Sequence, residues 1–185
     1  MADNLAIKVI ISSTREGRFG PNVGKWFFGV ASKHVGIDAE LVDLRDWVLP
    51  YFDESKSPIT GEIADEAQEW AKLIDSADGY VIVTPEYNHG YPAVLKNALD
   101  HVYYDWARKA VAFVSWGGTG GTRCVEQLRL VTIELDMVPT RWAVHIPNPW
   151  FIKDASELRT DPNQQAATAL LDHLTWWTQA LKNAR

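Results

Sequence analysis

The sequence predicts a doubly wound α/β fold, in which helices cover both faces of a five-stranded parallel sheet of order 2-1-3-4-5. Short apolar runs rich in β-branched residues alternate along the chain with segments of helical periodicity. This alternation is typical of parallel strands joined by helical crossovers. The chain has no internal repeat, and its 185 residues fit one ordinary domain. We therefore expect residues 1–185 to form a single domain.

The elements can be placed in order from the same patterns. Strands are expected at residues 6–11, 39–44, 79–84, 110–116 and 139–146, and helices at residues 21–35, 63–76, 92–104, 122–136 and 163–183. Residues 6–11 (AIKVII) are almost continuously apolar, as in a strand buried on both faces. Right-handed crossovers bring the carboxyl ends of the strands to one edge, where ligands of such folds bind. Three loops should meet there, at residues 12–22, 85–92 and 115–122.

Composition and charge argue against several classes of protein. The net charge of −6 and the lack of a basic stripe disfavour a nucleic-acid partner. No apolar run approaches the roughly 20 residues that cross a bilayer, and the polar, acidic start of the chain is unlike a secretory signal. The single cysteine, Cys124, cannot form an internal disulfide and has no partner base near it in sequence. We expect a cytoplasmic protein without a membrane partner, in which Cys124 is a buried or half-buried residue and not a catalytic thiol.

The loop at residues 12–22 (SSTREGRFGPN) joins the first strand to the start of a helix. Unpaired backbone N–H groups and the positive end of the helix dipole favour an anion at such a place. Three hydroxyls and two arginines add donors that match phosphate oxygens. The loop has neither the Gly-Lys-Ser/Thr ending of a Walker A sequence nor the Gly-x-Gly-x-x-Gly of a dinucleotide site. It suits a phosphate monoester best, and the alternative is a solvated polar turn.

The other two loops contain residues that could contact the faces and edges of a planar ring. Residues 84–92 (TPEYNHGYP) combine rigid prolines with Tyr87, a flat aromatic, and Asn88, whose amide can hydrogen-bond the edge of a heterocycle. His89 has no carboxylate partner at a telling spacing and is not expected to act as a base. Residues 115–121 (SWGGTGG) contain four glycines, which let backbone N–H groups approach a ring carbonyl. The histidines are scattered without metal-ligand spacing, so no metal is expected.

The three loops together resemble those of the NADPH-dependent FMN reductase family, and the resemblance covers nearly the whole chain. Residues 12–15 (SSTR) are similar to the Gly-Ser-x-Arg phosphate loop of that family, with Ser12 in place of the usual glycine. Arg18 matches the variant of this loop that carries a second arginine. Residues 85–88 are Pro-Glu-Tyr-Asn, its most specific signature, and residues 115–118 are similar to the segment that borders the flavin ring. The resemblance implies a flavodoxin-like three-layer fold.

The resemblance also implies an activity and a set of site residues. Hydride would pass from NADPH or NADH to bound FMN, and electrons would then pass to a small-molecule acceptor such as a quinone, free flavin, azo compound or metal oxyanion. The cofactor carries the redox chemistry, so no side chain is expected to be catalytic. The residues expected near the phosphate are Ser13, Arg15, Arg18 and Asn22, and those expected to line the ring are Pro85, Glu86, Tyr87, Asn88, Ser115, Gly117 and Gly118.

Members of this family are commonly dimers or tetramers, so we expect a homodimer or homotetramer. The candidate interface consists of the loop at residues 45–61 and the helix at residues 92–106, both rich in aromatic residues. Aromatic side chains that could reach a neighbour's pocket are Trp47, Tyr51, Tyr103 and Trp106. Trp150 also lies in a loop. For the loop tryptophans an interface, a pocket wall and simple core filling all stay open.

Two other functions are compatible with this fold. A flavodoxin-type electron carrier usually has a phosphate loop rich in Ser and Thr without arginines, so Arg15 and Arg18, together with Pro-Glu-Tyr-Asn, favour the reductase. A redox sensor that changes partners with the state of its flavin is the third alternative. The sequence does not identify the acceptor. Since no arginine can be assigned to a 2′-phosphate, it does not choose between NADPH and NADH either.

Overall fold

A computed structural model describes residues 4–185, which contain a sheet of order β2-β1-β3-β4-β5 with all neighbouring strands parallel. The strands are β1 (Leu5–Ile11), β2 (Ile37–Asp43), β3 (Gly79–Pro85), β4 (Ala110–Gly117) and β5 (Val138–Pro147). The α-helices are α1 (Gly20–Ala31), α2 (Gln68–Asp75), α3 (Ala93–Asp100), α4 (Thr122–Glu134) and α5 (Asp161–Ala184). The predicted α/β fold and its strand order are confirmed.

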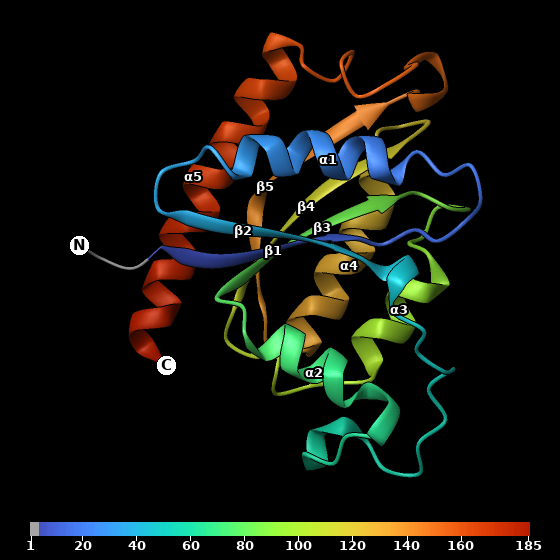
Figure 1. Ribbon diagram of the computed structural model, residues 1–185, viewed down its shortest axis with the longest axis vertical. Coiled ribbons are helices and arrows are strands. Elements are labelled where there is room, and N and C mark those ends of the chain that lie inside the picture. Colours follow the sequence, from blue (N-terminus) through green and yellow to red (C-terminus); the bar gives the residue numbers. More distant parts are fainter. Residues whose placement is uncertain (1–3) are drawn as a thin grey trace.

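The helices form two layers on the sheet. Helices α1 and α5 cover one face and α2, α3 and α4 cover the other, as Figure 1 shows. Successive residues of a strand point to opposite faces, so Val9 packs in the core under α1 and α5, and Ile10 packs in the core under the other three helices. Because both faces are buried, β1, β3 and β4 have continuous apolar runs and not an alternating pattern.

Several helices are shorter than their apolar periodicity predicts. The helix expected at residues 21–35 ends at Ala31, and a turn then leads to Gly36, whose φ of 82° is left-handed. The helix expected at residues 63–76 begins only at Gln68, after a 3₁₀ turn at Asp65–Ala67. Ile63, before α2, packs against the core from outside the helix, whereas Val35, after α1, is 90% exposed, so the periodic pattern extends past both helices for different reasons.

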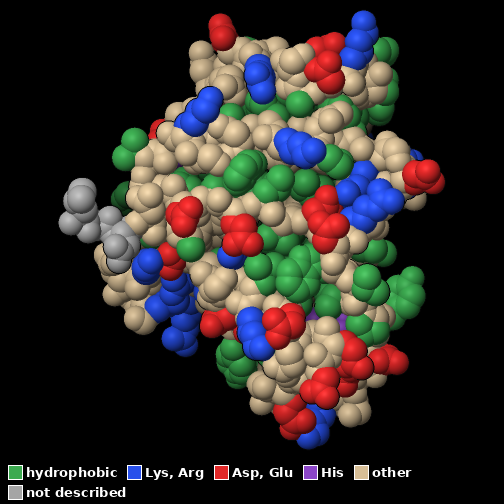
Figure 2. All heavy atoms as spheres, in the orientation of Figure 1, with side chains coloured by type: hydrophobic (Ala, Val, Ile, Leu, Met, Phe, Trp, Pro, Cys, Tyr) green, Lys and Arg blue, Asp and Glu red, His purple; other side chains and the backbone are tan. Residues whose placement is uncertain are grey.

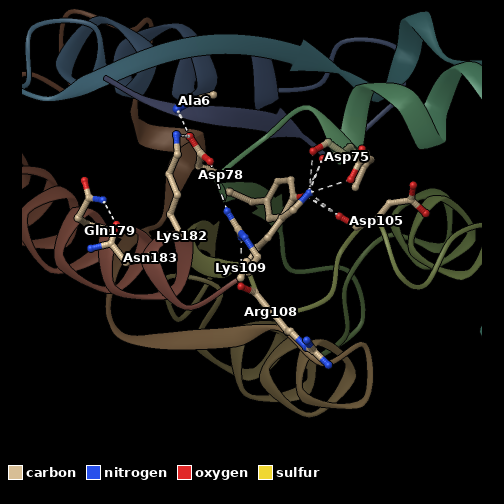
Figure 3. A network of polar contacts seen from close by, with 12 residues as sticks. Ala6, Asp75, Asp78, Asp105, Arg108, Lys109, Gln179, Lys182 and Asn183 are labelled. Carbon is tan, nitrogen blue, oxygen red and sulfur yellow. Dashed lines mark hydrogen bonds and ion pairs between the residues drawn. The ribbon is translucent and has the colours of Figure 1, made fainter. Parts of the chain in front are cut away.

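A buried lysine ties together the segments at the amino edge of the sheet (Figure 3). Lys109 is 5% exposed, and its Nζ donates to the carbonyl oxygens of Ile74 (3.2 Å), Asp75 (2.9 Å) and Asp105 (2.8 Å). Its ammonium also lies 5.8 Å from the centroid of the Tyr80 ring. A cation at the C-terminus of a helix satisfies unpaired carbonyls and opposes the negative end of the dipole. Lys109 thereby joins the end of α2 to the turn before β4.

A second group of charges at the same edge fixes the end of α5 (Figure 3). Asp78 accepts from the backbone N–H of Ala6 (2.9 Å) and pairs with Lys182 (2.7 Å) and Arg185 (3.3 Å). The side chain of Asp78 is 13% exposed, so these contacts are partly shielded from water. Side-chain contacts of Lys109 and Asp78 therefore stabilise the amino edge of the sheet. The candidate ligand loops lie at the other edge, the carboxyl edge.

The long connection after β2 runs over α3 and exposes apolar side chains. The N–H of Phe52 donates to Asn97 Oδ1 (2.9 Å), and the Tyr104 hydroxyl donates to the carbonyl of Ile59 (3.0 Å). Val48 is 93% exposed and Tyr51 is 88% exposed. Figure 2 shows hydrophobic side chains beside acidic ones at the lower right of the molecule, where Figure 1 places this segment. The predicted interface loop thus presents apolar surface.

Trp106 does not belong to that surface, and its assignment to an interface is wrong. Its side chain is 1% exposed, and its ring packs edge-on against Tyr80 (4.8 Å between centroids) and Trp70 (6.0 Å). Trp47 also packs against Trp70, at 5.3 Å, and is half-buried. Tyr103 is half-buried as well. Trp106 fills the core, which is one of the alternatives that the sequence left open.

Within the part of the chain that the structure describes, no helix combines the length and the apolar character that crossing a membrane requires.

Candidate functional site

The three predicted loops meet at the carboxyl edge of the sheet, on the right of Figure 1, and surround a cavity of about 390 Å³. This volume is within the range of small-molecule sites. The lining residues come from the three loops and from the turn after β5: Arg15, Gly17, Phe19, Pro85, Glu86, Tyr87, Trp116, Gly117, Gly118, Pro149, Trp150 and Ile152. Six of the eleven residues predicted from the sequence are among them, namely Arg15, Pro85, Glu86, Tyr87, Gly117 and Gly118.

A larger hollow, of about 610 Å³, lies between α1 and α5 at the opposite edge of the sheet. Its lining comes from the end of α1, the turn that follows it and α5, and includes His34, whose Nε2 is 2.9 Å from Asp172 Oδ1. None of the three predicted loops reaches it. Ligands of open α/β sheets bind outside the carboxyl ends of the strands. The cavity of about 390 Å³ is therefore the candidate site.

The first loop contains polar groups that have no partner. Ser12 Oγ and Ser13 Oγ are fully buried, and neither has a hydrogen-bond partner within residues 4–185. The backbone N–H groups of residues 13–17 find no acceptor in the same part of the chain. Ser13 Oγ lies against the first turn of α1, since a Cβ added to Gly20 would stand 2.5 Å from it. Buried polar groups are normally paired, so these residues fit a phosphate monoester held at the N-terminus of a helix.

The two arginines of this loop have different environments. Arg15 is exposed, lines the cavity and lies 5.9 Å from the centroid of the Tyr87 ring. Arg18 forms two parallel bonds of 2.7 Å to the carboxylate of Asp43 at the end of β2, and it also donates to the Ser13 carbonyl. The charge of Arg18 is thus compensated by Asp43, and the side chain holds the shape of the loop. Of the two, Arg15 faces the cavity and Arg18 does not line it.

The second loop folds as a tight hairpin turn. Tyr87 and Gly90 exchange both backbone hydrogen bonds, each 2.9 Å long, and the two residues between them, Asn88 (φ 50°) and His89 (φ 71°), have positive φ. This is the pattern of a type I′ turn, in which asparagine is favoured. Gln127 Nε2 donates to the carbonyl of His89 (2.9 Å) and anchors the tip. Pro85 and Tyr87 border the cavity, whereas Asn88 lies at the tip and does not line it.

Glu86 fastens this loop to helix α4. Its side chain is 7% exposed, its Oε1 is 3.3 Å from Arg123 Nε, and its Oε2 accepts from the backbone N–H of Arg123 (3.2 Å). Arg123 is in the first turn of α4, where a carboxylate interacts favourably with the helix dipole. Both carboxylate oxygens of Glu86 therefore interact with Arg123 of α4.

Ser115 stabilises the glycine turn and does not line the cavity. Its hydroxyl is buried, donates to the carbonyl of Gly120 (2.7 Å) and lies 2.8 Å from His145 Nδ1. Burial lowers the pKa of His145 below its usual 6.5, which favours the neutral ring. Gly121 has a φ of 77°, and a Cβ there would stand 2.7 Å from Ser115 Cβ, so only glycine fits. Ser115 thus supports the glycine turn from outside the cavity lining, and its contact with the ring stays a prediction.

Asn22 and Ser13 also lie outside the cavity lining. Asn22 is in the first turn of α1, and Ser13 is fully buried near the start of the first loop. Conversely, the sequence reasoning missed Gly17, Phe19, Trp116, Pro149 and Ile152 as lining residues. The turn after β5 could have been found, because the carboxyl end of β5 lies at the same edge of the sheet as the others. Trp150, which the sequence left as a possible pocket wall, does line the cavity.

Cys124 is buried in α4, and burial raises the pKa of its thiol to about 12. Its Sγ donates to the carbonyl of Gly121 (3.1 Å). Because the thiolate is the reactive form, we expect the folded protein to resist alkylation at neutral pH. Mass spectrometry after iodoacetamide treatment should show one adduct in denaturant and almost none in buffer. Labelling in buffer at the denatured rate would contradict the buried placement.

Among residues 4–185, no three His, Cys, Asp or Glu side chains are grouped so that they could hold a metal ion.

Comparison with known proteins identifies the family. The sequence profile of the NADPH-dependent FMN reductases matches residues 5–150. This chain belongs to the NADPH-dependent FMN reductase family. An NAD(P)H-dependent FMN reductase of Schizosaccharomyces pombe is 41% identical over 146 residues, which cover 76% of this chain and 73% of that protein. A quinone reductase of Escherichia coli K12 is 31% identical over 183 residues, which cover 95% of this chain and 92% of that protein.

Solved structures agree with the fold. The flavoenzyme FerB of Paracoccus denitrificans, an NAD(P)H:acceptor oxidoreductase, superposes with a TM-score of 0.76 at 18% identity, covering 95% of this chain and 98% of that one. The chain is therefore an oxidoreductase of flavodoxin-like fold. The prediction of FMN as cofactor and a reduced nicotinamide as reductant is confirmed at the level of the family.

Proposed function

We propose that this protein is an FMN-dependent NAD(P)H oxidoreductase whose acceptor is a small planar quinone. The observation that carries the proposal is the open, aromatic-lined cavity at the carboxyl edge of the sheet, next to a loop with unpaired donors for phosphate. The Escherichia coli quinone reductase, which aligns with almost the whole chain, supports the choice of acceptor. In the balanced reaction NAD(P)H, one proton and a quinone give NAD(P)⁺ and a hydroquinone.

FMN, when bound, supplies a ring that takes hydride from the nicotinamide and returns two electrons to the acceptor. The residues of the chain hold the group and expose one face of it. Ser13, the N–H groups of residues 13–17 and the guanidinium of Arg15 would bind the phosphate. Pro85, Tyr87 and the glycines of the third loop would border the ring.

The carboxylate, hydroxyl and imidazole groups closest to the cavity are not placed to act as a general acid or base. Glu86 is paired with Arg123, and the hydroxyl of Ser115 faces His145 and not the cavity. His89 lies at the tip of the second loop, outside the lining. We infer that the protons consumed in quinone reduction come from water in the open cavity. Catalysis then consists of positioning two substrates in turn on the same exposed face, a ping-pong order.

The alternative function is a flavodoxin-type carrier without turnover of its own. Arg15 on the cavity wall and the rigid Pro85–Asn88 segment favour the reductase. The test is steady-state oxidation of NADPH and of NADH by the flavin-loaded protein, with a naphthoquinone or free FMN as acceptor. We expect turnover that requires both a nicotinamide and an acceptor. A yellow holoprotein that oxidises neither nicotinamide with either acceptor would support the carrier.

We also propose that the protein self-associates, as a dimer or tetramer, through the segment after β2 and the end of α3. Val48, Tyr51, Ile59 and Tyr104 together expose an apolar area there. Sedimentation velocity of the holoprotein should give a mass of at least two chains, and Tyr51→Lys should shift it toward one. Monomeric wild-type protein with intact flavin binding would exclude an interface that completes the site.

A further inference from the structure

Trp150 is an exposed indole at the mouth of the cavity. It follows β5 in a 3₁₀ turn, lines the cavity and is 64% exposed. A Cβ added to Gly118 would stand 3.5 Å from the Trp150 ring, so the indole lies directly over the glycine turn of the third loop. Ligand cavities are lined mainly by hydrophobic and aromatic side chains, and Trp150 is such a lining residue. The chain thus presents a flat, electron-rich surface next to the proposed flavin ring.

The backbone that carries this indole is held by its surroundings. The N–H of Asn148 donates to the carbonyl of Gly117 (2.9 Å), which joins the turn after β5 to the turn after β4. Pro149 restricts the backbone before Trp150, and the N–H of Ile152 donates to the carbonyl of Pro149 (3.0 Å). A residue whose backbone is already restrained loses less freedom when a ligand stacks on its side chain.

The chemistry of the cavity indicates what would stack there. Arg15 contributes a positive charge to the lining, and the negative charge of Glu86 is paired with Arg123. A planar, electron-poor ring with carbonyl oxygens is complementary to an electron-rich indole and a guanidinium. Quinones have these properties. The nicotinamide substrate, in contrast, also carries ribose, phosphate and adenine groups that can make other contacts, so its binding should depend less on Trp150.

We propose that the electron acceptor stacks on the indole of Trp150, and that this indole determines the preference of the enzyme for planar quinones. The inference rests on the proposed function, because it assigns the acceptor step of that reaction to this side chain. Trp176 offers a matched control, since it is also 64% exposed but lies on α5, where its ring packs against Trp177 (5.0 Å between centroids) and does not line the cavity.

The first experiment compares wild type with Trp150→Ala, Trp150→Phe and Trp176→Ala in the flavin-loaded protein. We expect Trp150→Ala to raise the KM for 1,4-naphthoquinone about tenfold and Trp150→Phe to raise it only about two- to threefold, because phenylalanine keeps an aromatic face. The KM for NAD(P)H and the Kd for FMN should stay within about twofold of wild type, and Trp176→Ala should match wild type throughout. An equal loss for both substrates, a weakened flavin, or an unchanged naphthoquinone KM would each overturn the proposal.

The second experiment measures binding without turnover. The oxidised holoprotein is titrated with 1,4-naphthoquinone by calorimetry, in the absence of any nicotinamide, and Trp150→Ala should bind about tenfold more weakly. If the wild type binds in this way but never reduces the quinone, the proposed function fails and the binding site stands. If the wild type reduces the quinone and Trp150→Ala binds and reduces it equally well, the proposed function stands and this inference fails. If the wild type shows neither binding nor reduction, both are wrong.

Discussion

Replacement of Arg15 with alanine is expected to weaken FMN binding by about 1.5–3 kcal/mol, or about 10- to 150-fold in Kd. Arg15 faces the cavity from the first loop, beside backbone N–H groups that lack acceptors. Arg18, the other arginine of the loop, is bonded to Asp43 and to the Ser13 carbonyl. Loss of Arg15 therefore removes the arginine that is placed to form a charge-assisted hydrogen bond with the phosphate.

The Kd is best measured by titrating apoprotein with FMN and following the loss of flavin fluorescence. Arg15→Lys should recover part of the affinity, since it restores the charge without the forked geometry. Arg45→Ala is the matched control, because Arg45 is also exposed but lies after β2 and does not line the cavity. An unchanged Kd for Arg15→Ala would remove Arg15 from the phosphate site. An equal loss for Arg45→Ala would mean that only net charge matters.

Lys109→Met is expected to destabilise the protein by about 1–3 kcal/mol near neutral pH, without a direct effect on the cavity. Methionine fills a similar volume, but it leaves the carbonyl of Asp75 without its lysine donor and removes contacts to Ile74 and Asp105. Urea unfolding of both proteins gives the difference in free energy. A difference below about 0.5 kcal/mol would show that these carbonyls are satisfied in another way.

The same pair of proteins tests a pH dependence. Burial lowers the pKa of Lys109 from its usual 10.5 to about 8. Between these values the unfolded chain binds the proton more tightly than the folded chain, so the contribution of Lys109 to stability increases as the pH rises. The slope is at most about 1.4 kcal/mol per pH unit. Cys124, whose pKa is raised to about 12, acts in the opposite direction above about pH 9 in both proteins. Only the difference between wild type and Lys109→Met isolates the lysine, and it should widen above about pH 8.

The strand order and the convergence of three loops were predictable because they depend on local patterns. A run such as residues 6–11, which is short and rich in β-branched residues, is typical of an inner strand, and right-handed crossovers then leave few arrangements. The resemblance of the loops to those of a family carried the prediction from a phosphate site to FMN. Arg15 and Tyr87, which were predicted in this way, line the cavity.

What the sequence could not show depends on contacts between distant parts of the chain. The phosphate contact expected of Arg18 stays a prediction, but its pairing with Asp43, 25 residues away, could not be foreseen. Trp106 was expected at an interface, but Tyr80 and Trp70 surround it in the core. No local pattern shows which residue will face an arginine or a tryptophan after folding. The turn after β5 has no motif of its own, so only Trp150 was named there as a possible pocket wall, and Pro149 and Ile152 were not.

We propose that the carboxyl edge of the sheet holds a flavin that exchanges electrons with a nicotinamide and a quinone. The most direct measurement is the visible absorption spectrum of the purified, FMN-reconstituted protein under anaerobic conditions. We expect a flavin band that stays with the protein through gel filtration, bleaches on addition of NADPH or NADH, and returns when a naphthoquinone is added. A protein that retains no flavin, or whose flavin band neither nicotinamide bleaches, would contradict this account.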